Sequence, residues 1–215
     1  MEINFKISSL ETVAEISENG RITRRLLSVP QMLKILSEAV GESYEDNEYF
    51  TTPLLPPGTI WYQEDLQKPE AYRLAIFQPA GIRQVIFNDR QYMVGFPPAV
   101  YKLQIEEKIL RGISVFAVRD VILNPDTVLC YFPYFNYFNT IGGVNICLGG
   151  NRIAVNHPWE ALKVIQMLEY IPYDYARHTL KTELEGDSLL KTVEGKPFPL
   201  EWLVETNMIL KNILK

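Results

Sequence analysis

Seven short apolar segments, separated by turn residues, dominate the middle of the chain and limit the folds it can adopt. Over residues 59–132 they are TIWYQ, YRLAIFQ, RQVIFN, YMVGF, VYKLQI, GISVFAV and TVLCYF. The intervening QPAG, FNDR and LNPD hold the residues that favour turns. We therefore predict an antiparallel β-meander. Several segments are apolar on both faces, so other elements should cover the sheet.

A strand-rich N-terminal part and a helix are predicted before this region. Residues 1–27 are predicted to form strands, with ENG at Glu18–Gly20 as a hairpin turn. In SVPQMLKILSEAVG, Ser28 is a suitable N-cap, Pro30 suits the first turn, and Gly41 suits the C-terminal end. We predict a helix there.

Two more helices are predicted after the sheet. HPWEALKVIQMLEY has Asn156 or His157 as a possible N-cap and Pro158 in the first turn. One face of this helix is apolar, with Ala161, Leu162, Ile165 and Leu168. A polar stretch, KTELEGDSLLKTVEGK, then leads to a predicted final helix, whose apolar residues are Leu200, Leu203, Val204, Leu210 and Ile213. Antiparallel strands kept apart from helices indicate an α+β fold.

The segment GESYEDNEYFTTPLLPPG, polar and then proline-rich, suggests an internal boundary. We expect N-terminal strands and a helix over residues 1–57, as a possible separate subdomain. The main domain should then cover residues 58–215, with the C-terminal helices included. A chain of 215 residues can bury a sizeable core without disulfides.

Composition excludes several classes of function. The chain has 21 Lys and Arg against 26 Asp and Glu, a net charge of −5, and no dense basic run, so no nucleic-acid partner is expected. No signal peptide and no apolar run of transmembrane length occur in it. With only two cysteines, a disulfide framework is not expected. We expect a cytoplasmic location and no membrane partner.

The segment GGVNICLGG, residues 142–150, raises the main question about function. A catalytic cysteine reacts as the thiolate, so Cys147 would need help from a cation such as Arg152 or from the following helix. Gly149 and Gly150 leave space beside the sulfur and can expose N–H groups to an oxyanion. Free cysteine is also among the most buried residue types, so the residues alone favour a structural role for Cys147.

The other candidate groups have simpler interpretations. Cys130 lies mid-strand in TVLCYF and is expected to be structural. A Cys–His pair of Cys147 with His157 or His178 is conceivable, but a capping or surface role suits His157 better. No zinc-ligand cluster and no nucleotide-binding glycine motif occurs, so no metal or cofactor is expected.

The segment P-Y-F-N…G-G-V-N-I-C-L-G resembles the active site of the ubiquitin-conjugating-enzyme superfamily. There an Asn precedes a glycine-containing turn, followed by an apolar residue, the catalytic Cys and a Leu. With CLGGNRI and the HPWEAL helix, this chain is most similar to the prokaryotic family D branch, which includes protein B of the PRTRC systems of plasmids and other mobile elements. FPPAVYKLQIEEKILRGISVFAV, PDTVLCYFPYFN and PFPLEWL are also similar, so the resemblance covers roughly residues 95–205.

This resemblance implies a UBC-like fold and a thioester carrier. A ThiF-type adenylating enzyme would activate the C-terminus of a ubiquitin-like modifier. Cys147 would receive it, and an amine would then attack the thioester. The family's Asn falls on Asn139 by spacing or on Asn136 by the PYFN context. The family's His is absent, and Tyr134 and Phe135 stand in its region.

Two alternatives remain open. The first is a non-catalytic UBC-like binding module in a plasmid or mobile-element complex, motivated by the missing His. Any exposed aromatic residues of YFPYFNYF would then form a docking surface, although core packing should account for at least half of them. The second is a cysteine hydrolase.

Overall fold

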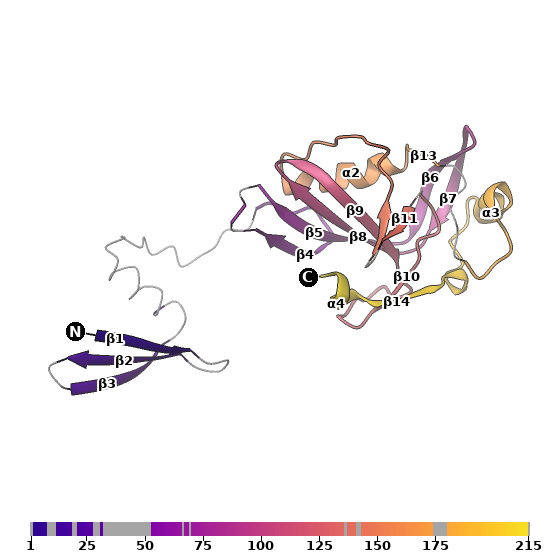
Figure 1. Ribbon diagram of the computed structural model, residues 1–215. Helices are drawn as coiled ribbons and strands as arrows, with labels where there is room; N and C mark the ends of the chain where they lie inside the picture. Colours follow the sequence, from indigo (N-terminus) through magenta and orange to yellow (C-terminus); the bar gives the residue numbers. More distant parts are fainter. Residues whose placement is uncertain are drawn as a thin grey trace. The chain divides into compact units, whose positions relative to one another are not determined.

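The computed structural model divides into two compact units, Met1–Thr52 and Pro53–Lys215 (Figure 1). The structure describes residues 2–7, 12–18, 21–27, 31, 53–65, 67–68, 70–135, 137–140, 143–173 and 180–214, and for 2–27, 137–144 and 173 only the backbone. Whether residues 1–57 form a separate subdomain stays a prediction.

The N-terminal unit contains a three-stranded antiparallel sheet. Its strands are β1 (Glu2–Ile7), β2 (Thr12–Glu18) and β3 (Arg21–Leu27), in the order β1-β2-β3. Glu18 lies opposite Arg21, which confirms the strands and the hairpin predicted there. The helix predicted over residues 28–41 lies, apart from Gln31, outside the described residues.

The larger unit is built on a mostly antiparallel sheet with strands in the order β11-β12-β9-β8-β5-β4. These strands are β4 (Thr59–Glu64), β5 (Tyr72–Gln78), β8 (Ala99–Glu106), β9 (Ile109–Ala117), β11 (Tyr137–Thr140) and β12 (Gly143–Ile146). Two further strands extend it: β10 (Val128–Cys130) pairs with β9, and β14 (Glu205–Ile209) pairs with β10. The predicted strands and the α+β class are confirmed.

The simple meander order is wrong, because one hairpin leaves the main sheet. β5 pairs with β8, while β6 (Gly81–Phe87) and β7 (Arg90–Phe96) pair with each other and with β13 (Pro172–Tyr173). The dipeptide Pro97–Pro98 follows β7 and cannot donate backbone hydrogen bonds to a ladder. The chain can therefore change sheets at this point.

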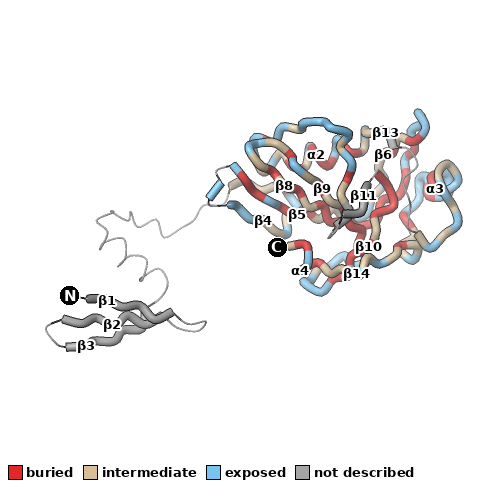
Figure 2. Tube along the Cα trace, in the orientation of Figure 1, coloured by how far each residue is buried: buried red, intermediate tan, exposed pale blue. Residues whose placement is uncertain are grey.

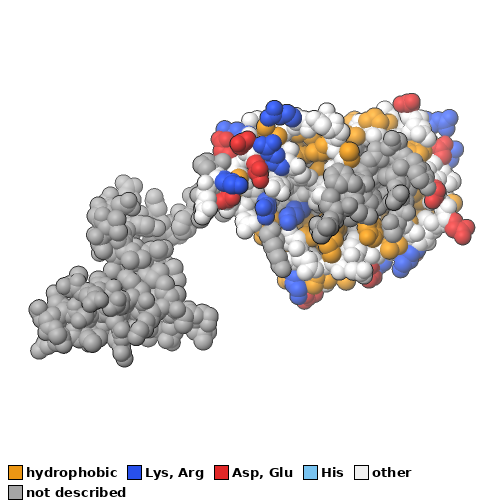
Figure 3. Space-filling view, in the orientation of Figure 1, with side chains coloured by type: hydrophobic (Ala, Val, Ile, Leu, Met, Phe, Trp, Pro, Cys, Tyr) orange, Lys and Arg blue, Asp and Glu red, His pale blue; other side chains and the backbone are white. Residues whose placement is uncertain are grey.

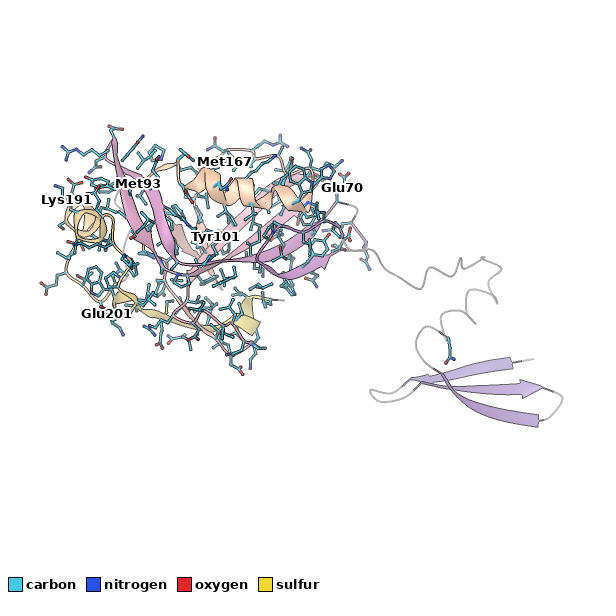
Figure 4. The ribbon with its side chains drawn as sticks, turned by 180° about the vertical axis from the view of Figure 1, so that it is seen from behind. Glu70, Met93, Tyr101, Met167, Lys191 and Glu201 are labelled. Atoms are coloured by element: carbon cyan, nitrogen blue, oxygen red, sulfur yellow. The ribbon has the colours of Figure 1, made fainter. Side chains whose placement is uncertain are left out.

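Helices cover both faces of the main sheet, as Figures 1 and 2 show. On one face η1 (Pro158–Glu160) and α2 (Ala161–Leu168) pack over the larger core, which includes the fully buried Tyr101 (Figure 4). On the other face the short α4 (Leu210–Ile213) packs against a smaller cluster containing Ala75, Val100 and Phe116. Each fully buried Leu or Ile contributes roughly 1.5–3 kcal/mol.

The helix predicted after residue 156 is confirmed, but neither proposed N-cap side chain caps it. His157 occupies the N-cap position without a side-chain hydrogen bond. The Glu160 carboxylate instead accepts a hydrogen bond from the Asn156 backbone N–H at 2.8 Å. No helix among the described residues is long and apolar enough to cross a membrane.

The predicted final helix is wrong. Residues 200–213 form a 3₁₀ turn, η2 (Leu200–Trp202), then β14 and α4. The edge of β10 offers backbone partners to β14, and the Thr206 hydroxyl adds a 2.9 Å bond to the Leu129 carbonyl. Asn207, with φ of 61°, is also not helical. Tertiary pairing thus overrides the helical spacing of the apolar residues.

The polar stretch before this segment contains a helix that the sequence did not predict. It is α3 (Gly186–Val193), and a capping box between Glu185 and Ser188 starts it. Its apolar side buries Leu189, Leu190 and Val193. The order Glu185-x-x-Ser188 is the reverse of the usual Ser/Thr-x-x-Glu signature, so the sequence contained no standard start signal for this helix.

Much of the aromatic segment before the cysteine loop is core. Phe132, Tyr134 and Phe135 are buried, and the Phe132 and Phe135 rings stack at a centroid distance of 5.2 Å. The Tyr134 hydroxyl donates a 2.7 Å hydrogen bond to the Gly95 carbonyl. These three rings are therefore not a docking surface. They tie the segment that leads into the cysteine loop to β7.

Tyr134→Phe is expected to lower the free energy of unfolding by about 1–2 kcal/mol. It leaves the buried carbonyl of Gly95 without this partner while keeping the packing of the ring. Urea unfolding followed by circular dichroism measures the loss. Tyr170→Phe, at a side chain that is 65% exposed, is the matched control and should change little. Equal stabilities of the two variants would contradict the role of the bond.

Candidate active site around Cys147

The thiol of Cys147 is held at the surface. Cys147 directly follows β12 and is exposed. Ile146 before it is buried in the larger core, and Leu148 after it packs against the same core. Because both neighbours point inward, the cysteine between them is directed outward. The burial that a purely structural cysteine would show is not found at this position.

Cys130 shows the opposite environment. It lies in β10 with no exposed surface, as predicted for a structural residue. Burial raises the pKa of the Cys130 thiol, and the nearby Arg119 guanidinium only partly opposes this rise. The two cysteines therefore differ in accessibility, since only Cys147 is exposed.

The loop that holds Cys147 is a bulge at the edge of β9. Before it, Asn145 of β12 lies opposite Ser114 of β9. After it, the chain returns to the same strand, where Ala154 is bridged to Ile109. Residues 147–152 therefore leave the edge of β9 and rejoin it, so the thiol lies beside the middle of this strand.

A tight turn closes the bulge. The Leu148 carbonyl accepts hydrogen bonds from the Asn151 backbone N–H at 3.1 Å and from its Nδ2 at 2.8 Å. Gly149 and Gly150 have φ of 60° and 79°, where a side chain would be strained. A Cβ on Gly150 would meet no atom within 4 Å, so this side of the loop is open.

The stretch of β9 beside the loop is itself irregular. Gln104 of β8 lies opposite Gly112, but the next residue, Ile105, lies opposite Leu110. Arg111 is therefore an extra residue, as in a β-bulge. A Cβ on Gly112 would also meet nothing within 4 Å. The surface next to the thiol thus has open space where a side chain would normally stand.

Two arginines lie on the segments that frame the thiol. The Arg111 guanidinium pairs with Glu107 at 2.9 Å and with Glu106 at 3.9 Å, both as exposed ion pairs. Arg152, at the end of the bulge, is exposed. Arg111 is therefore partly neutralised by carboxylates, whereas Arg152 has no ion pair with any described residue.

An amide that the sequence reasoning missed lies near the thiol. The Ser114 hydroxyl donates a 2.5 Å hydrogen bond to Asn145 Oδ1. Asn145 stands two residues before Cys147, and residues i and i+2 of an extended chain lie on the same face. The tripeptide N-I-C was the signal for Asn145 in the sequence, whereas the family resemblance indicated Asn136 or Asn139.

The structure does not test the roles predicted for Asn136 and Asn139. Asn136 lies outside the described residues. The backbone of Asn139 lies in β11 opposite Val144, and its side chain lies outside the described part. Val144 is three residues before Cys147, which is roughly 10 Å along a strand. A supporting role for either asparagine stays a prediction.

The histidines give no support to a Cys–His pair. His157 is exposed and stacks on Trp159 with ring centroids 6.2 Å apart. No hydrogen bond joins it to Cys147, and His178 lies outside the described residues. Across the described residues, no group of three His, Cys, Asp or Glu side chains could hold a metal ion.

Comparison with known proteins identifies the family. Residues 32–168, well over half of the 215-residue chain, match the model of prokaryotic E2 family D. The chain belongs to prokaryotic E2 family D. No curated protein and no solved structure matches it. The resemblance inferred from the segment around Cys147 is thereby confirmed.

Membership of family D makes this a UBC-like protein. In general it implies interaction with a ubiquitin-like modifier and an adenylating enzyme. The family match includes the main sheet from β4 to β12, the Cys147 loop and α2. The elements from β13 to α4 lie beyond it, although β14 and α4 contribute to the same unit.

Proposed function

We propose that Cys147 accepts the C-terminal acyl group of a ubiquitin-like modifier as a thioester and passes it to an amine. The observation that carries this proposal is the exposure of Cys147 on a loop whose flanking residues, Ile146 and Leu148, are fixed in the core. Membership of family D supplies the class of partner.

The chemistry requires two acyl transfers. In the first, the Cys147 thiolate attacks the activated carbonyl carbon. A C–S bond forms, the bond to the leaving group on the adenylating enzyme breaks, and the thiol proton passes to solvent. In the second, an amine attacks the thioester, so that a C–N bond forms and the C–S bond breaks. The amine proton is released and the thiol is regenerated.

The arrangement offers several aids to these steps. The glycine turn leaves room for the modifier's backbone to approach the sulfur. Arg152 is an exposed cation on the same loop. The Ser114 hydroxyl donates a hydrogen bond to Asn145 Oδ1 and so holds this amide two residues before the thiol.

The test is formation of a thioester adduct. The protein is incubated with ATP, a ThiF-type adenylating enzyme and the ubiquitin-like modifier from the same gene neighbourhood. We expect a covalent adduct that reducing agent releases and that is absent from Cys147→Ala. Cys147→Ser should give an oxyester that resists the reducing agent. Cys130→Ala serves as the control and should retain the adduct.

Two other results would overturn the proposal. No adduct with a demonstrably active adenylating enzyme would favour the non-catalytic binding module. A Cys147-dependent release of peptide or ester products without any adenylating enzyme would favour a cysteine hydrolase. The association with PRTRC-type plasmid systems stays a prediction, and the neighbouring genes test it.

A further inference from the structure

A short side-chain hydrogen bond joins the strand that carries the thiol to the rest of the sheet. The Ser114 hydroxyl of β9 donates to Asn145 Oδ1 of β12 at 2.5 Å. Among the described residues, Asn145 opposite Ser114 is also the one register position at which β12 pairs with β9. Because β11 and β12 lie at the end of the strand order, this position attaches their hairpin to the sheet.

Ser114, Asn145 and Cys147 share the face of the sheet opposite α2. On β9, the residues before and after Ser114 belong to the core beneath α2, so Ser114 points to the other face. On β12, Ile146 belongs to the same core. Asn145 and Cys147, on either side of it, therefore point to the face of Ser114.

The neighbour of Ser114 on the other side is Lys102 of β8. Its ammonium lies over the ring of Trp61 in β4, 5.7 Å from the ring centroid. Because β4 lies beyond β5 in the strand order, this side chain extends away from β9. Figure 3 shows basic and acidic side chains gathered at the same β4–β5 end. The Ser114 hydroxyl instead bonds on the side of the thiol, to Asn145.

The far attachment of the thiol loop leaves the position of the sulfur open. There the Ile153 carbonyl accepts a 2.9 Å hydrogen bond from the Leu110 N–H, six residues after Cys147. A chain of six residues can span up to roughly 20 Å, so this attachment is compatible with many positions of the thiol. Asn145 is only two residues away and constrains the thiol more closely.

The apolar pattern of β12 does not by itself fix the position of this strand along β9. Val144, Ile146 and Leu148 occupy every second position. A slip by one residue would turn them away from the core, but a slip by two would again present apolar residues to it. Such a slip would move the thiol by roughly 6.6 Å along β9.

The hydrogen bond distinguishes the registers that core packing does not. After a slip by two residues, Gly143 or Cys147 would lie opposite Ser114 in place of Asn145. Glycine has no side chain, and the sulfur of a thiol is a weak acceptor. A hydrogen bond depends on distance and direction, whereas apolar contacts are non-directional. The bond therefore favours the register observed.

We propose that Ser114 and Asn145 are positioning residues, whose hydrogen bond fixes the register of β12 on β9 and so places Cys147 where it meets the activated acyl group. This inference rests on the proposed function, because it concerns the placement of the same thiol. Neither side chain forms or breaks a bond in the transfer. Both act through the position of the sulfur.

The test compares Ser114→Ala, Asn145→Ala and the double variant with the unmodified chain. Loading is the initial rate of adduct formation with ATP, a ThiF-type adenylating enzyme and the ubiquitin-like modifier from the same gene neighbourhood. Alkylation by iodoacetamide measures the reactivity of the Cys147 thiol itself. Hydrogen–deuterium exchange over residues 143–150 measures how firmly β12 is held.

We expect each single variant to load about fivefold more slowly, since the net strength of one hydrogen bond changes an equilibrium by about this factor. The double variant should load no more slowly than the single ones, because both substitutions remove the same bond. Exchange over residues 143–150 should become faster. Alkylation of Cys147 should not change, because the thiol stays on the exposed face in either register.

Two controls separate position from stability. Ser114→Thr keeps the hydroxyl and should load like the unmodified chain. Ser188→Ala removes a hydroxyl that donates a 2.6 Å hydrogen bond to the Glu185 carbonyl in the capping box of α3. It should lower the free energy of unfolding without slowing the loading.

The outcomes separate the two proposals. Normal loading of Ser114→Ala overturns the positioning role, and so do losses that add up in the double variant. A parallel fall of alkylation and loading also overturns it, because the thiol itself would then have changed. If the unmodified chain forms no adduct, the thioester function fails and exchange decides the register. Faster exchange in Ser114→Ala then supports the role of the bond, and unchanged exchange overturns it.

Discussion

Gly95→Ala is expected to destabilise the larger unit by about 3 kcal/mol or more. A Cβ at this position of β7 would lie 2.2 Å from the Lys196 carbonyl oxygen, 2.4 Å from the Phe198 nitrogen and 2.7 Å from the Pro197 carbonyl carbon. All three are backbone atoms, which cannot move aside as the end of a flexible side chain can. Thermal unfolding should show a decrease in Tm of roughly 6–12 °C.

Gly112→Ala is the matched control, since it also adds one methyl group to a glycine in a strand. Its Cβ would meet nothing within 4 Å, so stability should change by less than about 0.5 kcal/mol. Similar losses from the two substitutions would show that strand glycines in general are responsible. The close approach of residues 196–198 to β7 would then not be the cause.

Iodoacetamide is expected to alkylate Cys147 about a thousandfold faster than Cys130 in the native protein. Cys147 is exposed, whereas Cys130 has no accessible surface and must await an opening that costs several kcal/mol. Burial also raises the pKa of the Cys130 thiol, which reduces its thiolate fraction further. Mass spectrometry of digested samples taken over time measures both rates.

Denaturant provides the control for this experiment. In unfolding urea the two cysteines should react at similar rates, because the difference comes from burial and not from the residues themselves. Equal native rates would contradict the assignment of Cys130 to the core.

The raised pKa of Cys130 also makes the stability of the fold depend on pH. The folded state holds the thiol proton more tightly than the unfolded state does. This contribution to stability is therefore present below the ordinary thiol pKa and is lost as the pH rises above it.

The local pattern of the sequence predicted the elements better than their partners. Alternation and turn residues were enough to find β4 to β9, and Asn88–Asp89 does form the tight turn between β6 and β7, with φ of 47° and 60°. The pairing of β5 with β8 depends on which strand edge is available in the folded protein. The residue types of the two strands do not predict this. The misassigned final helix has the same cause, since β14 forms only because the edge of β10 is there.

The sequence predicted the candidate thiol but not the residues that surround it. The glycines around Cys147 and the family resemblance identified the candidate thiol. Its exposure follows from the bulge at β9, and the neighbouring pair Ser114–Asn145 follows from strand register. Arg73 and Gln104 are 31 residues apart in the sequence, and only the pairing of β5 with β8 brings them opposite each other.

The contact of residues 196–198 with Gly95 also has a consequence for the order of folding during synthesis. Tyr134, which leads into the cysteine loop, bonds to the same glycine, so three distant segments share one anchoring point. A ribosome releases the cysteine loop well before it releases the last of these segments. On the nascent chain, the anchoring point at Gly95 therefore lacks residues 196–198 until the C-terminal region has emerged.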